Sequence, residues 1–269
     1  MLTALLLAVA VVAGCGNGDD GTGPDGTASH DYLPGLASYP HLPAGVTAAP
    51  VLVMIPGGAW RGADPTGLQP LARALADRGV VAVPVRIRAE GDGVYYPTPV
   101  DDVLCALADG VATARAAGIE PTRVALLGHS SGAHLAALAT LDPHQFRPDC
   151  QDPLVEAQAF VGLAGPYDIR TFVEAASALF RPGAAPAELA AANPVLLAAD
   201  RPEVPVLLLH GERDERVPVG FSTDFAAALQ AGGHPTTLTV LPREDHDSIY
   251  SASTAADPVA AWLEGLPQD

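Results

Sequence analysis

The chain has 269 residues, of which 49% are hydrophobic and 17% charged, and 31 acidic residues against 14 arginines and no lysine give it a formal net charge of −17. A chain of this length and apolar content can bury a large core and is commonly a single α/β domain. The acidic balance argues against nucleic-acid binding, because contacts to phosphates depend on clusters of basic side chains that this chain lacks.

The chain opens with an apolar stretch over residues 2–13, which is too short to span a bilayer as a helix. It ends in Val-Ala-Gly-Cys, the small-residue pattern at which bacterial lipoprotein signal peptides are cleaved. We therefore predict a signal peptide over residues 1–14, a lipid anchor on Cys15 and an exported, membrane-anchored bacterial protein. No basic residue precedes Arg61, so the positively charged start of such a leader is missing. An ordinary cleaved signal with a free Cys15 and a non-exported chain are the alternatives.

The remainder is predicted to be a tether followed by one folded domain. Residues 15–30 are rich in Gly, Asp and Thr, which is typical of a flexible tether, and the domain is expected over residues 31–269. In the domain, apolar strand-like runs alternate with Ala- and Leu-rich helical stretches, a pattern that predicts a mostly parallel sheet with helices on both faces. The clearest predicted helices cover residues 67–78, 99–117, 220–231 and 255–263.

The first chemically informative segment is a glycine pair. A strand-like run over residues 51–55 leads through Pro56 into Gly57 and Gly58, followed by Ala59 and Trp60. Glycines let backbone amides approach a bound group without a Cβ in the way. Amides placed in this manner can stabilise the oxyanion that forms during acyl transfer. We assign the oxyanion hole to the amides of Gly58 or Ala59.

Residues 128–132 (Gly-His-Ser-Ser-Gly) form the most informative motif of the chain. The motif follows an apolar run and opens into a helical stretch of small residues. A Gly-x-Ser-x-Gly sequence between a strand and a helix is typical of a nucleophile elbow, which makes Ser130 the predicted nucleophile. The next residue, Ser131, is predicted to supply the second amide of the oxyanion hole. The alternative role for Ser130 is that of an N-cap in a glycine-rich turn.

A serine nucleophile requires a general base and an acid that orients the base. Two later strand-like runs are each followed by a polar loop, one holding Asp214 and the other His246. The chain order Ser, Asp, His is the order expected of an α/β-hydrolase. Glu212 and Glu215 are alternative acids in the same loop, and His246 could instead be a surface histidine among acidic neighbours.

These segments together resemble the α/β-hydrolase superfamily, and more narrowly its esterase and lipase branch with a His-Gly-Gly-x-Trp loop. That branch includes bacterial carboxylesterases, feruloyl esterase-like and kynurenine formamidase-like enzymes. The resemblance runs from about residue 50 to the C-terminus and rests on the glycine pair with Trp60 and on residues 128–136 and 210–218. The chain departs from the family at Pro56, where the family usually has a histidine that helps to hold the loop.

The resemblance implies an α/β-hydrolase fold with a small cap, and a serine hydrolase that cleaves carboxylic esters through an acyl-enzyme. The expected substrate is a small-molecule or polysaccharide-linked ester. Trp60, Phe172 and Phe180 are predicted to line the substrate pocket, with burial in the core as the alternative. An amidase or peptidase with the same triad and a catalytically silent surface binding protein are the alternative functions. The sequence holds no dinucleotide fingerprint, phosphate loop or metal-ligand spacing, so we expect neither a cofactor nor a metal.

The two remaining cysteines are predicted to form a disulfide. Export would place Cys105 and Cys150 in an oxidising compartment, where an even pair is expected to bond. Cys105 lies on the helix before the nucleophile strand and Cys150 in the loop after the nucleophile helix, and in a doubly wound hydrolase these two helices are neighbours. Two unrelated buried thiols are the alternative.

Overall fold

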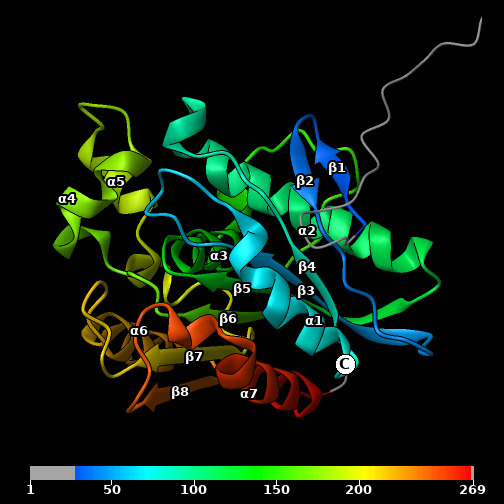
Figure 1. Cartoon of the computed structure of the whole chain (residues 1–269). Coiled ribbons are helices and arrows are strands. Elements are labelled where there is room, and N and C mark those ends of the chain that lie inside the picture. The colour runs from blue at the N-terminus through cyan, green and yellow to red at the C-terminus, as the bar shows by residue number, and fades with distance from the viewer. Residues whose placement is uncertain (1–27, 268–269) are drawn as a thin grey trace, which may run out of the picture.

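A computed structural model describes residues 28–267, in which a six-stranded parallel sheet is covered by helices on both faces (Figure 1). Its strand order is β4-β3-β5-β6-β7-β8. This arrangement confirms the predicted fold class. The strands are β3 (Ala48–Ile55), β4 (Val81–Pro84), β5 (Glu120–His129), β6 (Ala159–Leu163), β7 (Val206–Gly211) and β8 (Thr236–Leu241).

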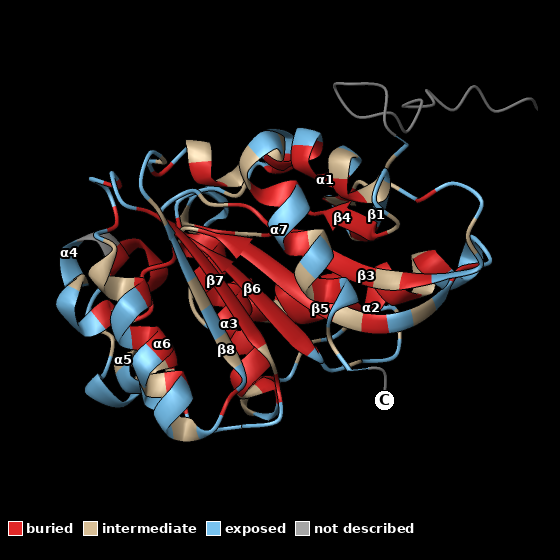
Figure 2. Ribbon diagram, turned by 90° about the horizontal axis from the view of Figure 1, so that it is seen from below, coloured by how far each residue is buried: buried red, intermediate tan, exposed pale blue. Residues whose placement is uncertain are grey.

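The central strands are mostly apolar where helices cover both of their faces. Every residue of β6 and β7 is buried, whereas exposed and half-buried residues alternate along much of the edge strand β8 (Figure 2). In β3, Val51 and Val53 belong to one core and Leu52 and Met54 to the other. This period of two places successive side chains on opposite faces of the sheet.

Five helices of eight residues or more form the two outer layers. On one face α1 (Gln69–Ala76) and α7 (Ala252–Glu264) enclose the smaller core. On the other face α2 (Thr98–Ala116), α3 (Ser131–Leu141) and α6 (Gly220–Gly232) enclose the larger one. The four predicted helices are confirmed with small shifts of their ends. The first begins later than predicted because residues Pro65–Leu68 form a 3-10 turn that the Asp64 side chain caps.

The segment before β3 forms a hairpin that packs beside the sheet edge. It consists of β1 (His30–Leu33) and β2 (Leu36–Ser38), so regular structure begins at the last residue of the predicted tether. Isolated antiparallel bridges join Ser38 to Val85 and His41 to Ala82, which covers part of the edge strand β4. Cys15 and the predicted leader lie outside the described residues. Within residues 28–267 no helix has the length and apolar character needed to cross a membrane.

A small cap lies between β6 and β7, at the carboxyl end of the sheet. It contains the short helices α4 (Val173–Ala176) and α5 (Pro186–Ala191), which project from the body of the molecule at the left of Figure 1. The small cap that the resemblance implies is therefore present.

A disulfide joins α2 to the loop that follows α3. The sulfur atoms of Cys105 and Cys150 are 1.97 Å apart and their Cα atoms 5.1 Å apart. The predicted pairing is confirmed, and the bond ties α2 to the loop that follows α3, the neighbouring helix on the same face of the sheet.

Candidate active site

Ser130 lies on a sharp turn between β5 and α3. Its backbone dihedrals are φ 53° and ψ −126°, a conformation that is costly for a residue with a side chain. The flanking glycines make the turn possible. A Cβ on Gly132 would lie 2.4 Å from the carbonyl oxygens of Ile55 and Pro56, and one on Gly128 would lie 2.4 Å from the Gly132 carbonyl oxygen. The two glycines therefore let the end of β5, the start of α3 and the residues at the end of β3 lie in close contact around Ser130.

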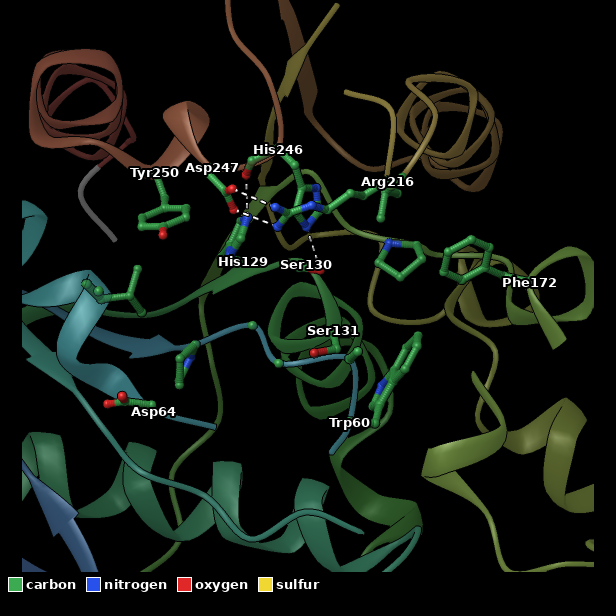
Figure 3. Close-up of a pocket in the computed structure, with 18 residues that line it drawn as sticks. Trp60, Asp64, His129, Ser130, Ser131, Phe172, Arg216, His246, Asp247 and Tyr250 are labelled. Carbon is green, nitrogen blue, oxygen red and sulfur yellow. Dashed lines mark hydrogen bonds and ion pairs between the residues drawn. The ribbon is translucent and has the colours of Figure 1, made fainter. Parts of the chain in front are cut away.

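The structure brings the predicted nucleophile, base and acid together in one chain of hydrogen bonds. His246 Nε2 lies 2.9 Å from Ser130 Oγ (Figure 3). On its other side, His246 Nδ1 lies 2.7 Å from Asp214 Oδ2. Asp214 and His246 are only 8% and 7% exposed. The rival acids Glu212 and Glu215 are exposed and make no contact with His246 among the described residues. The spatial arrangement thus favours Asp214 as the acid.

Asp214 is held in one orientation by its own loop. Its Oδ1 accepts hydrogen bonds from the amides of Arg216 and Val217, at 2.9 and 2.8 Å. Burial favours the protonated acid, but hydrogen bonds from His210, His246 and the Val217 amide outweigh it and hold the pKa of Asp214 well below its usual range. The ionised carboxylate accepts the Nδ1–H of His246. Nε2 of His246 is then left to act as a base toward Ser130.

His210 supports the acid loop from below. Its Nε2–H donates to the Val217 carbonyl at 2.8 Å, and its Nδ1 lies 2.7 Å from the Ser222 hydroxyl in α6. Its side chain is fully buried. His210 therefore has a scaffold role, in which it positions the loop that carries Asp214.

His129 supports the base, a role that sequence reasoning missed. Its Nε2–H donates to the carbonyl of His246 at 2.8 Å, and its ring packs against those of His246 and Tyr250 at centroid distances of 4.8 and 4.4 Å. Burial, with the nearby His246, lowers the pKa of His129 to about 3, so the ring stays neutral and keeps this donor. The motif places His129 beside Ser130, but no sequence signal links it to a loop 117 residues away.

The predicted oxyanion donors surround the nucleophile. Gly58, Ala59 and Ser131 all line the pocket that contains Ser130, and none of their amides is bonded to a backbone acceptor among the described residues. Gly58 is needed because a Cβ there would lie 2.0 Å from the Gly62 carbonyl oxygen. Ala59 continues the turn at φ 53°. These free amides are suited to bind a developing negative charge.

The glycine loop is held through Trp60, the residue at its end. Trp60 Nε1–H donates to His134 Nδ1 at 3.3 Å, and His134 Nε2–H donates to the Ala192 carbonyl at 2.9 Å. Burial lowers the pKa of His134 to about 4, which keeps one neutral tautomer with an acceptor for Trp60 and a donor for Ala192. His134 therefore connects the loop to the cap.

The substrate pocket has a volume of about 380 Å³. Trp60 and Phe172 line it as predicted (Figure 3), whereas Phe180 does not. Phe180 is 6% exposed, packs against Tyr96 at a centroid distance of 5.8 Å and lines a separate cavity. The prediction for Phe180 was wrong because the fold of the cap, and not its sequence, decides which aromatic faces Ser130.

Charged residues at the pocket mouth were also missed by sequence reasoning. Arg216 pairs with Asp247 through two contacts of 2.9 Å, and this pair spans the loops that carry Asp214 and His246 (Figure 3). Asp64, which caps the 3-10 turn before α1, lines another wall. Within residues 28–267 no group of three or more metal-ligating side chains gathers.

Comparison with known proteins agrees with this geometry. The BD-FAE family model matches residues 41–229. The chain belongs to the BD-FAE family. The probable carboxylic ester hydrolase LipM of Mycobacterium tuberculosis is 32% identical to this BD-FAE protein over 230 residues, which cover 79% of this chain and 53% of LipM. Esterase LipQ of the same organism is 29% identical over an alignment that covers 88% of this chain and 59% of LipQ.

Solved structures share the fold at lower identity. The acetyl ester-xyloside bifunctional hydrolase from Caldicellulosiruptor lactoaceticus superposes with a TM-score of 0.73 at 22% identity, over 85% of this chain and 87% of the other. Esterase Est2 of Thermogutta terrifontis superposes with a TM-score of 0.71 at 21% identity, over 89% of this chain and 92% of Est2. These matches confirm the α/β-hydrolase fold. The BD-FAE protein spans little more than half the length of the curated relatives that it matches.

Proposed function

We propose that this BD-FAE protein is a serine hydrolase that cleaves carboxylic esters. The observation that carries the proposal is the hydrogen-bonded series Ser130–His246–Asp214 beside three free amides. An ionised acid, an oriented imidazole and a strained serine at the top of a parallel sheet are the parts that acyl transfer requires. The names of the relatives LipM and LipQ give independent support.

Each step of the reaction has a residue in place. His246 Nε2 takes the proton of Ser130 as Oγ attacks the carbonyl carbon of the ester. The resulting oxyanion accepts hydrogen bonds from the amides of Ser131 and of Gly58 or Ala59. His246 then gives its proton to the departing alcohol, which leaves an acyl group on Ser130. A water molecule, deprotonated by His246, hydrolyses the acyl-enzyme and restores the free serine.

The dimensions of the pocket favour esters of short acids. A volume of about 380 Å³ with Trp60 and Phe172 in its walls suits a small acyl group and a modest alcohol. One structural neighbour, Est2, was solved with butyrate and with propionate bound. Another is named as acting on an acetyl ester and a xyloside. We infer that short-chain esters, including esters of small molecules and of polysaccharides, are the substrate class.

Hydrolysis of p-nitrophenyl esters with acyl chains of two to eight carbons tests this function. Turnover should be greatest for the shorter chains, disappear in Ser130→Ala and disappear after modification with a fluorophosphonate. Ser253→Ala, at an exposed serine on α7 that does not line the pocket, is the matched control and should retain activity. Labelling of Ser130 without ester turnover would favour an amidase or peptidase. A folded protein with neither activity nor labelling would favour the silent binding protein.

We propose in addition that the protein is exported and anchored to a membrane by lipid on Cys15. The leader pattern before Cys15 supports this proposal, and so does the Cys105–Cys150 disulfide, because such bonds persist in oxidising compartments. Expression of the full chain in a bacterium with a radiolabelled fatty acid should label the protein and place it in the membrane fraction. Cys15→Ser should abolish both. Equal labelling of the two chains would refute the anchor.

A further inference from the structure

A second cavity lies between the cap and the segment that precedes α2. It has a volume of about 640 Å³, larger than the pocket around Ser130, and we call it the cap cavity. Residues that are adjacent in the chain line the two cavities: Phe172 lines the triad pocket and Val173 lines the cap cavity. The amide of Glu90, another lining residue, donates to the Trp60 carbonyl at 3.0 Å. Ser130, His246 and Asp214 are absent from its lining, so the site is distinct from the triad.

The interior of the cap cavity is apolar. Ile169, Ala176 and Phe180 are buried beneath it with exposures of 3%, 3% and 6%. Val173 also lines the cavity, and its side chain is 61% exposed. A ligand with an apolar body would remove this surface from water, and the free energy gained grows with the apolar area covered.

Arg181 gives the cap cavity a positive charge that no acidic side chain neutralises. Its guanidinium carbon lies 5.8 Å from the centre of the Tyr95 ring, and no carboxylate within residues 28–267 lies within ion-pair distance of it. An unpaired cation at a cavity is notable in a chain with a net charge of −17. A guanidinium held over an aromatic ring can donate two N–H groups to a carboxylate in a two-point contact.

The other charged residues of the cap cavity are already paired. Arg170 binds Asp168 through contacts of 2.8 and 2.7 Å, and Asp168 also accepts from the Asn193 amide at 3.0 Å. Glu90 lies 3.4 Å from Arg61. Among the described residues that line the cap cavity, Arg181 is therefore the one whose charge is available to a ligand.

We propose that the cap cavity binds an alkyl or aryl carboxylate. The apolar part of the ligand lies on Ile169, Val173 and Phe180, and its carboxylate contacts Arg181. An amphipathic monoanion matches the two features of the cavity, an apolar floor and a single unpaired cation. This site makes no use of Ser130, so its occupation does not depend on the proposed hydrolase activity.

Isothermal titration calorimetry with decanoate tests the proposal, with decan-1-ol as an uncharged ligand of the same chain length. Binding is measured in the Ser130→Ala background, where no chemistry can occur. Arg181→Gln should lower the affinity for decanoate about five- to tenfold and leave the affinity for decan-1-ol unchanged. Val173→Asp, which places a carboxylate in the lining of the cavity, should weaken decanoate further. Arg115→Gln is the matched control, because Arg115 is exposed at the far end of α2 and should leave both affinities unchanged.

Three results would overturn the site. The first is absence of decanoate binding. The second is equal decanoate affinity in the parent protein, Arg181→Gln and Val173→Asp, which would place the ligand elsewhere. The third is an equal loss of decanoate affinity in Arg181→Gln and Arg115→Gln, which would show that the effect arises from net charge alone. Fluorophosphonate labelling of Ser130 is a separate readout, so failure of the hydrolase proposal and failure of this one are distinguishable.

Discussion

At the scale of single residues, the acid of the triad gives the sharpest prediction. Asp214→Asn should lower kcat by about three to four orders of magnitude with little change in KM, because an amide cannot stabilise the imidazolium or fix the His246 tautomer as a carboxylate does. The fold should survive, since the Asn oxygen can still accept the amides of Arg216 and Val217. Glu212→Gln, an exposed acid in the same loop, is the control. A larger loss in Glu212→Gln than in Asp214→Asn would reassign the acid.

The buried side chain of His134 should make the free energy of unfolding depend on pH. Its pKa is lowered from 6.5 to about 4 in the folded protein by burial. Between pH 6.5 and about 4 the unfolded chain therefore binds a proton at this residue that the folded protein does not. The free energy of unfolding should fall as the pH decreases through this window, by up to about 1.4 kcal/mol for each pH unit from this histidine. His129, with a pKa lowered to about 3, acts in the same direction.

Urea unfolding at several pH values measures this dependence. His134→Gln should be less stable than the parent at pH 7, because one of the two hydrogen bonds to Trp60 and Ala192 is lost. Its stability should nevertheless change less steeply between pH 6.5 and 4, since the titrating group is gone. Parallel pH profiles for the two proteins would show that His134 is not buried in its neutral form.

At the scale of elements, the nucleophile elbow depends on a close contact between a strand and a helix. Gly132→Ala should destabilise the fold by about 1–3 kcal/mol and lower kcat, because a Cβ only 2.4 Å from two backbone carbonyl oxygens of β3 and its following loop forces the first turn of α3 away. Gly220→Ala at the start of α6 is the control, since nothing lies within 4 Å of its added Cβ. Thermal unfolding and ester turnover of both variants provide the comparison. Equal effects would show that the elbow tolerates a side chain.

Local sequence patterns predicted the strand, turn and helix that carry the nucleophile. The strand, the Gly-x-Ser-x-Gly turn and the following helix depend on contacts within a short segment, so Ser130 and its glycines could be identified from sequence. Asp214 and His246 were assigned because each lies in a polar loop after a strand-like run and because the chain order Ser, Asp, His is that of an α/β-hydrolase. Phe180 and His129 could not be assigned because their roles depend on which distant segments meet them. The cap contacts Tyr96, and the base loop contacts His129, through packing that leaves no periodic signal.

At the scale of the whole molecule, the order of the strands assembles the site. Ser130, Asp214 and His246 follow β5, β7 and β8, which lie in one half of the sheet in the order β5-β6-β7-β8. The glycine loop follows β3, the neighbour of β5 on the other side. The oxyanion donors and the general base therefore approach Ser130 from opposite directions, and any substrate must lie between them. This arrangement requires α3, which lies in the long connection from β5 to β6, to stay in a fixed position.

The Cys105–Cys150 disulfide closes that connection, and its removal provides a test of stability at this scale. The bond spans 45 residues that include β5, Ser130 and α3. Its main effect should be to restrict the unfolded chain, so the variant Cys105→Ala/Cys150→Ala should lose about 4 kcal/mol of unfolding free energy in the chain-entropy description. Urea unfolding should give this loss, while ester turnover at 25 °C should stay near that of the parent because neither cysteine lines the pocket. The parent treated with a reductant should unfold like the variant, and a variant as stable as the oxidised parent would show that native packing alone holds α2 against α3.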